Sequence, residues 1–153
     1  MPDPFASPDL DRELRARVYE HFIDTGRAPS AEDLAGALGT DVATVDGSLQ
    51  RLAAAHALVL DPRSAEILMA HPFSATATDY PVYARGITYW ANCAWDALGV
   101  PVLLGNDAVS VAACPDCAVR LTLEVRDGSV RSNADVVHFL VPARDFWRDI
   151  GFT

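Results

Sequence analysis

Three successive runs of apolar residues at helical spacing constrain the fold of the first half of this chain more than any other feature. In the first run, Leu14, Val18 and Phe22 recur every four residues before a glycine ends the pattern. This spacing places the three side chains on one face of an amphipathic helix. The second run follows Ser30, a favourable N-cap residue, and stops near Gly39. The first half must therefore bury several helical faces against one another.

The third run begins near Asp41, and two short apolar segments follow it. Its apolar residues recur at intervals of three and four: Val42, Val45, Leu49 and Leu52. The segments HALVLD and EILMA are typical of two strands around the turn signal Asp61-Pro62. Three helices and a hairpin in this order resemble a winged helix-turn-helix, which we place at residues 12–70. Residues 1–11, rich in Pro and Asp, are predicted to be loose.

The second half combines a helix with several short strands. A turn-rich link leads to a helix that contains Cys93 and Asp96 and is predicted to end at Gly99, before Pro101. Strands are predicted at 109–113, 120–125 and 136–141, with a hairpin turn at Asp127-Gly128 and a short helix after Pro142.

The elements together predict an α+β fold. It consists of a winged-helix-like helical module followed by a small mixed β-sheet core at residues 71–153, with the Cys93/Asp96 helix packed on that core.

Composition limits the partners of this chain. Its 153 residues include 12 basic side chains, all of them arginine, and 21 acidic ones, for a net charge of −9. An acidic chain binds polyanions poorly, and the third helical segment carries only Arg51 as a base, so we expect no nucleic-acid partner. No apolar run is long enough to span a bilayer, and the N-terminus lacks a secretory pattern. We therefore expect no membrane partner and a cytoplasmic location.

The first cysteine lies beside an aspartate. Cys93 and Asp96 are three residues apart, and on a helix they would share a face with Trp90 and Ala97. An apolar setting favours the neutral forms of a carboxyl group and of a thiol, so Asp96 could hold a proton to donate. The same spacing is also that of an ordinary core cysteine beside a solvated aspartate.

The other two cysteines form the C-x-x-C of ACPDCAVRL. Cys114 and Cys117 could be half of a zinc site, a redox pair or a soft-metal clamp, and the Pro-Asp between them also fits an ordinary turn. An odd cysteine count without a secretory pattern favours reduced thiols over disulfides. His138, in an apolar segment, fits a core histidine better than a metal ligand.

The segment YWANCAWDALGVPVLLG, followed by a cysteine and VRLTLEV, resembles the central region of the alkylmercury (organomercurial) lyase family. The later VVHFLVPARDFW resembles the family's strand-then-helix segment. The resemblance extends over most of the chain from about Glu13 and is specific at residues 93–105. It implies the family's fold, including a helical, winged-helix-like N-terminal module.

The resemblance also implies cleavage of a carbon–mercury bond. It makes Cys93 the mercury-binding thiolate and Asp96 the proton carrier, with no cofactor required and a soft metal (mercury, or copper or zinc) as ligand or substrate. Thiolates are preferred ligands of soft metals, and a nearby acid can protonate the departing carbanion. Trp90, Trp95 and His138 are predicted to line the substrate pocket.

The sequence departs from the family pattern at its second catalytic cysteine. That residue precedes the strand ending in His-Phe, where this chain has Ala-Asp-Val at 134–136. We therefore predict a diverged member in which Cys114 or Cys117 supplies the second thiol. Cys93, Cys114 and Cys117 would then form one soft-metal site.

Other functions remain open from the sequence. One alternative is a non-catalytic thiol protein of the same fold that binds or carries metal, and a variant of it is a diverged lyase acting on another carbon–heteroatom bond. A third is a winged-helix regulator whose cysteines sense metal. Only catalysis requires a proton donor beside the metal, so replacing Asp96 separates a lyase from a carrier.

Overall fold

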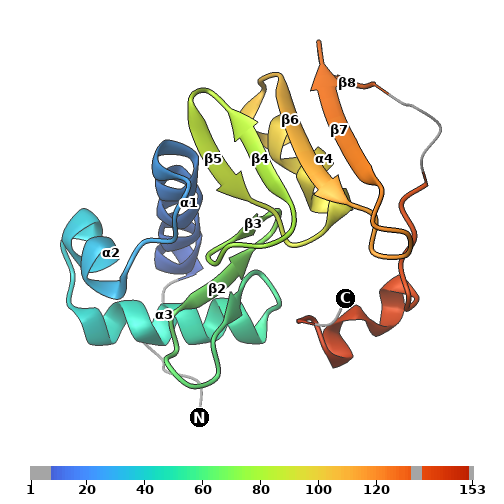
Figure 1. Cartoon of the computed structure of the whole chain (residues 1–153). Coiled ribbons are helices and arrows are strands. Elements are labelled where there is room, and N and C mark those ends of the chain that lie inside the picture. The colour runs from blue at the N-terminus through green and yellow to red at the C-terminus, as the bar shows by residue number, and fades with distance from the viewer. Residues whose placement is uncertain (1–7, 132–135, 152–153) are drawn as a thin grey trace.

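The computed structural model describes residues 8–131 and 136–151. The described residues form helices and two antiparallel sheets, which confirms the predicted α+β class (Figure 1). None of the helices in these residues is long and apolar enough to cross a membrane.

The first three helices follow the predicted apolar runs. They are α1 (Pro8–Thr25), α2 (Ala31–Leu38) and α3 (Val42–Ala54). The side chains that α1 was predicted to bury are fully buried: Leu14, Val18 and Phe22. Because α1 begins at Pro8, residues 8–11 are helical and the prediction that they are loose is wrong; the residues before them lie outside the described part of the chain.

Local capping defines where α2 begins. The Ser30 hydroxyl accepts the backbone N–H of Asp33 at 3.1 Å, and the Asp33 carboxylate accepts the backbone N–H of Ser30 at 3.0 Å. This capping box satisfies two backbone donors that would otherwise lack a partner. Gly39 ends α2 in the left-handed conformation, as its position in the sequence predicted.

A three-stranded antiparallel sheet follows the helices in the order β1 (Val59–Leu60), β2 (Ile67–Ala70) and β3 (Phe73–Ser74). The first two strands confirm the predicted hairpin. The third lies in the segment that was predicted to be a turn-rich link, and its Phe73 also forms a β-bridge to Ala91. The winged-helix-like assignment of residues 12–70 stays a prediction.

The second sheet has five strands in the order β5-β4-β6-β7-β8. Every neighbouring pair is antiparallel, so the prediction of a mixed sheet is wrong. Short turns join β4 to β5 and β7 to β8, and such hairpin turns only connect antiparallel strands. The strands are β4 (Pro81–Ala84), β5 (Ile87–Trp90), β6 (Ala108–Ala113), β7 (Arg120–Arg126) and β8 (Ser129–Val130).

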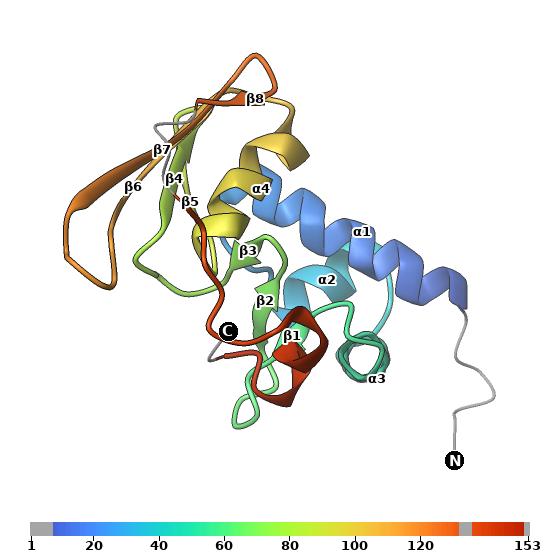
Figure 2. The same cartoon turned by 90° about the vertical axis from the view of Figure 1, so that its right-hand side faces the viewer.

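The fourth helix, α4 (Ala94–Leu104), packs against β4 and β7 and covers one face of the five-stranded sheet (Figure 2). It continues through Pro101, so the predicted end at Gly99 is wrong. The proline removes only one backbone donor, and its ring is buried. Gly105 ends the helix in the left-handed conformation at a φ of 61°.

The end of the chain differs from the predicted strand and helix. Residues 136–141 form no strand, and Val136 is 85% exposed. An apolar composition does not by itself make a strand, because a strand also needs a partner, and residues 136–141 pair with neither β5 nor β8, the outer strands of the sheet. The predicted helix after Pro142 is the short 3₁₀ helix η1 (Ala143–Arg148). It lies beside the end of α3, where the Trp147 ring stacks on the His56 ring at 4.0 Å.

One buried core connects the helices to both sheets. The Phe22 ring of α1 stacks on the Phe73 ring of β3 with centroids 5.1 Å apart. The Tyr89 side chain of β5 is fully buried, and its hydroxyl donates to the Ile23 carbonyl of α1 at 2.7 Å. The core therefore crosses the predicted boundary at residue 70.

Candidate functional site

Cys93 is the N-cap of α4, at the point where the chain leaves β5. Its sulfur accepts the backbone N–H of Asp96 at 3.5 Å, and its carbonyl accepts the N–H of Ala97 at 2.9 Å. The thiol and the Asp96 carboxyl group therefore meet in the first turn of the helix, as the spacing predicted. Cys93 itself precedes the helix, and Trp90 lies in β5 and not on the helical face where it was predicted.

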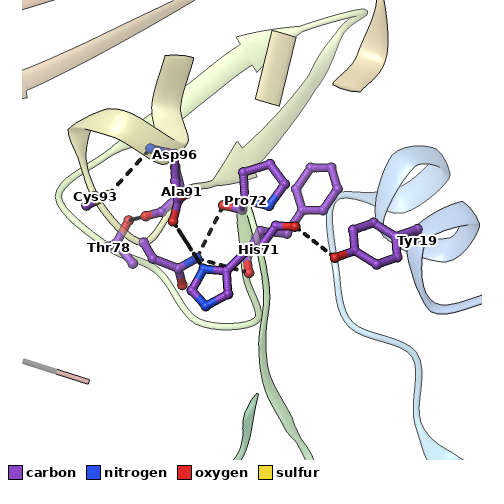
Figure 3. A network of polar contacts seen from close by, with 9 residues as sticks. Tyr19, His71, Pro72, Thr78, Ala91, Cys93 and Asp96 are labelled. Atoms are coloured by element: carbon purple, nitrogen blue, oxygen red, sulfur yellow. Dashed lines mark hydrogen bonds and ion pairs between the residues drawn. The ribbon is translucent and has the colours of Figure 1, made fainter. Parts of the chain in front are cut away.

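A polar network holds the Asp96 side chain, which is 16% exposed. Its Oδ2 accepts from the side-chain amide of Asn92 at 3.0 Å and lies 3.4 Å from Nδ1 of His71 (Figure 3). The Asn92 amide nitrogen also lies 3.3 Å from the Pro72 carbonyl oxygen. The carboxylate is thus fixed by Asn92, which precedes the N-cap of α4, and by His71 in the loop between β2 and β3.

Two further hydrogen bonds hold the loops around this network (Figure 3). The Tyr19 hydroxyl of α1 donates to the His71 carbonyl at 2.8 Å. The Thr78 hydroxyl donates to the Ala91 carbonyl at 2.6 Å, just before Cys93. The first contact ties the backbone of the β2–β3 loop to α1, and the second ties the backbone that leads into α4 to Thr78. The positions of His71 and Asn92, which contact Asp96, therefore depend on how these elements pack.

Sequence reasoning did not identify His71 or Asn92. Asn92 is four residues before Asp96 but precedes the N-cap of α4, so the pairing rule for helix surfaces does not describe its contact with Asp96. His71 is 25 residues from Asp96 in the chain, and only the tertiary fold brings the two together. The carbonyl oxygen of the Asn92 side chain is buried with no hydrogen-bond partner among the described residues.

The surroundings of Cys93 favour its neutral thiol. Burial raises the pKa of the Cys93 thiol, and the negative charge of Asp96 raises it further. Backbone N–H groups at the helix start oppose these effects, while a hydrogen bond between the thiol and the Asp96 carboxylate adds to them. The largest of these effects, burial and the Asp96 charge, both favour the protonated form of Cys93.

Cys114 and Cys117 lie at the tip of the hairpin between β6 and β7. The backbone N–H of Cys117, then that of Asp116, then the Cys117 thiol form hydrogen bonds to the Cys114 sulfur, and together they lower the pKa of the Cys114 thiol. All three cysteines are free thiols, and Cys117 is exposed.

The three cysteines do not gather into one metal site in this structure. Within residues 8–131 and 136–151, no three His, Cys, Asp or Glu side chains are placed to hold one metal ion. Cys93 and Cys114 nevertheless both lie near Tyr80. Burial is the main effect that raises the pKa of the Tyr80 hydroxyl, and the charges of Cys93, Asp79 and Cys114 raise it further.

A groove of about 670 Å³ opens beside the first turn of α4. Trp95, which is 62% exposed, and His138 both line it, together with Phe146. Two of the three predicted pocket residues thus share one groove, and Trp90 is not among its lining residues. His138 is exposed, so the prediction of a core histidine is wrong, because the strand that would have buried it does not form. Of the positions where the family's second cysteine was expected, residues 134 and 135 lie outside the described residues.

Comparison with known proteins gives a family and a fold. The family model for alkylmercury lyase matches residues 73–152, more than half of the chain. No curated protein matches the sequence. Among solved structures, the crystal structure of the mercury-bound form of MerB2 is similar, with a TM-score of 0.64 and 22% sequence identity. The similarity covers 84% of this chain but 61% of that one, so this chain spans about three fifths of that protein.

Proposed function

Because this chain belongs to the alkylmercury lyase family, we propose that it binds an organomercurial through Cys93 and cleaves the carbon–mercury bond with a proton carried by Asp96. The observation that carries this proposal is the meeting of thiol and carboxyl group in the first turn of α4, where the backbone N–H of Asp96 donates to the Cys93 sulfur. A soft thiolate and an adjacent proton carrier are the two groups that this reaction requires.

The proton balance follows from the state of the thiol. Because the pKa of Cys93 is raised, the sulfur carries its proton at neutral pH. As the sulfur bonds to the mercury of R–Hg–X, X⁻ leaves and the thiol proton passes to the Asp96 carboxylate. The sulfur–mercury bond weakens the bond from mercury to carbon. Asp96 then protonates that carbon, R–H leaves, and mercury(II) remains on the Cys93 sulfur.

Neighbouring groups would position these reactants. Asn92 and His71 hold Oδ2 of Asp96, so the carboxylate stays aligned with the thiol while the proton moves. The groove lined by Trp95 and Phe146 lies at the same helix start and offers an apolar surface to the organic group of the substrate.

We also propose that residues 12–70 form a winged-helix-like module with a structural role and no nucleic-acid partner. Arg51, the only basic residue of α3, pairs with the Asp11 carboxylate of α1 at 2.6 Å. Its guanidinium group is therefore engaged within the protein. Three free thiols fit the reducing conditions of the cytoplasm, where we place the protein.

The test is single-turnover cleavage of phenylmercury by the reduced full-length chain, with benzene as the measured product. Asp96→Asn keeps the side-chain shape but cannot carry the proton, so we expect a rate about 10² to 10⁴ times lower. Cys93→Ser should release no benzene. Asp46→Asn, on the exposed side of α3, is the matched control and should keep the wild-type rate.

Two results would contradict the proposal. Benzene released by Asp96→Asn at the wild-type rate would remove Asp96 from the reaction. Tight mercury binding that requires Cys93, without any benzene from the wild-type protein, would instead identify a non-catalytic metal carrier of the same fold.

A further inference from the structure

The hairpin tip between β6 and β7 is a closed loop. The backbone N–H of Cys114 donates to the Val119 carbonyl, and that of Ala118 donates to the Cys114 carbonyl, both at 2.8 Å. Ala118 has a φ of 59°, a left-handed conformation that costs a non-glycine residue about 1 kcal/mol or more. The fold therefore holds the C-x-x-C in a specific loop geometry despite this local cost.

This loop holds both cysteines of the C-x-x-C in one closed turn, because the N–H and the carbonyl of Cys114 are both hydrogen-bonded across it. Cysteine binds metals through its thiolate form. With no third His, Cys, Asp or Glu ligand placed to complete a site in the described residues, the pair offers two sulfurs only. A structural zinc ion requires four ligands, whereas two thiolates suffice for a soft dication such as mercury(II).

The sheet brings this loop to the same edge as Cys93. Strands β5, β4 and β6 are neighbours, and β4 is antiparallel to both of the others. Cys93 follows the end of β5, Cys114 follows the end of β6, and Tyr80 precedes the start of β4 between them. Two strand spacings, about 10 Å in total, therefore separate the chain at the two cysteines.

We propose that Cys114 and Cys117 form a second thiol site, distinct from Cys93, that takes the mercuric ion from Cys93 after the carbon has left. The inference rests on the proposed function for the source of that ion. The Cys114 thiolate bonds to the mercury on Cys93, and the Cys117 sulfur then displaces the Cys93 sulfur. The proton that Cys117 loses restores the Cys93 thiol. No atom changes oxidation state, and the ion ends on two thiolates, of which that of Cys117 is exposed.

This transfer would clear the buried thiol for another substrate. A single sulfur at Cys93 holds mercury(II) by one protein bond, whereas the hairpin tip holds it by two. The second bond forms within one loop, so it benefits from a high effective concentration. Exposure of Cys117 then gives small thiols in solution access to the bound ion.

The test supplies one equivalent of mercuric chloride to the reduced full-length protein without other thiols. Alkylation by iodoacetamide and peptide mapping then show which cysteines the ion protects. We expect protection of Cys114 and Cys117, with Cys93 open to slow alkylation. Competition with glutathione should show about 100-fold weaker retention of mercury in Cys114→Ser and in Cys117→Ser, and little change in Cys93→Ser. Asp116→Asn keeps both sulfurs and serves as the loop control.

Protection of Cys93 in place of the pair would overturn the proposal. So would a loss of mercury retention in Cys93→Ser that matches the loss in Cys114→Ser. Because the assay begins with mercuric ion, it decides whether the hairpin pair or Cys93 holds the ion at equilibrium, which is the direction of transfer that the proposal requires. It does so whether or not the protein releases benzene from phenylmercury, and the two proposals can fail separately.

Discussion

At the scale of single residues, the pKa values of two cysteines in this chain are shifted in opposite directions, and each shift has an identifiable cause. Burial and the charge of Asp96 raise the pKa of the Cys93 thiol, whereas hydrogen bonds from the hairpin loop lower that of Cys114. The thiolate is the reactive form of cysteine in alkylation as well as in metal binding. The local environment, and not the residue type, therefore decides which sulfur reacts first.

This difference predicts the order of labelling by iodoacetamide. At pH 7 the lowered pKa gives Cys114 the larger thiolate fraction, so it should react several-fold faster than Cys93, as measured by mass spectrometry of digested samples. The rate at Cys93 should keep rising as the pH increases beyond the ordinary range of a thiol. Asp96→Asn removes the second cause of the raised pKa and should speed the labelling of Cys93. Equal rates at pH 7 would show that the two environments do not differ as described.

The sequence predicted only part of this chemistry. The C-x-x-D spacing correctly placed the Cys93 thiol beside the Asp96 carboxyl group, because three residues span about one helical turn. It did not predict that Cys93 caps the helix, since the position of the first turn depends on where β5 ends. The contact between His71 and Asp96 could not be predicted from the sequence, because only the packing of the β2–β3 loop against α4 brings the two residues together.

At the scale of elements, one partly buried polar contact joins α1 to α3. The Asp11 carboxylate accepts from the Ser48 hydroxyl at 2.5 Å and from the Arg51 guanidinium at 2.6 Å. The hydrogen bond from Arg51 is the main effect that lowers the pKa of Asp11. A carboxyl group of this kind stabilises the fold while it is ionised.

The stability that this contact contributes should depend on pH. Asp11→Asn should lower the free energy of unfolding by about 1–2 kcal/mol at pH 7, a value reduced for partial exposure. Since the pKa is lowered in the folded state, the contribution is complete above the unfolded value of about 3.9 and disappears as the pH falls through the folded value. Urea unfolding at pH 7 and pH 3 measures this, with Asp46→Asn as control. An equal deficit at both pH values would contradict the assignment.

Element boundaries were predictable where local chemistry sets them. Ser30 and Asp41 mark the starts of α2 and α3 because their side chains cap those helices. The end of α4 was not predictable from Pro101, because burial of the ring and the Gly105 cap outweigh the lost hydrogen bond. Residues 136–141 have the composition of a strand, but pairing depends on a free neighbouring edge, which no local pattern reveals.

At the scale of the whole molecule, the aromatic side chains in the core join the N-terminal helices to the part of the chain that carries the site. The fully buried Phe73 ring lies 5.1 Å from Phe22, 5.7 Å from Tyr89 and 6.4 Å from Tyr19, measured between centroids. These rings come from α1 and from both sheets. We therefore expect the described elements to unfold as one cooperative unit.

Phe73→Ala should destabilise the whole protein by about 3–5 kcal/mol, because it leaves a cavity among these rings. Urea unfolding followed by circular dichroism and by tryptophan fluorescence should give one shared midpoint, displaced equally for both signals. Phe146→Ala, in η1 beside Phe139, removes a ring that is only partly buried and should cost much less. Separate midpoints for the two signals would show that the helices and the sheets unfold independently.

The β-bridge and ring contacts of Phe73 also bear on how such a protein can be recombined. The family's sequence signature begins at this residue, yet the surface on which its ring rests belongs to α1. The segment that matches the family model therefore depends on α1 for part of its core and is not an independent module. A chimaera that takes residues 73–152 from a relative would therefore also need that relative's first helix. Although α1 contacts no reacting atom, it would limit which sequences can be combined.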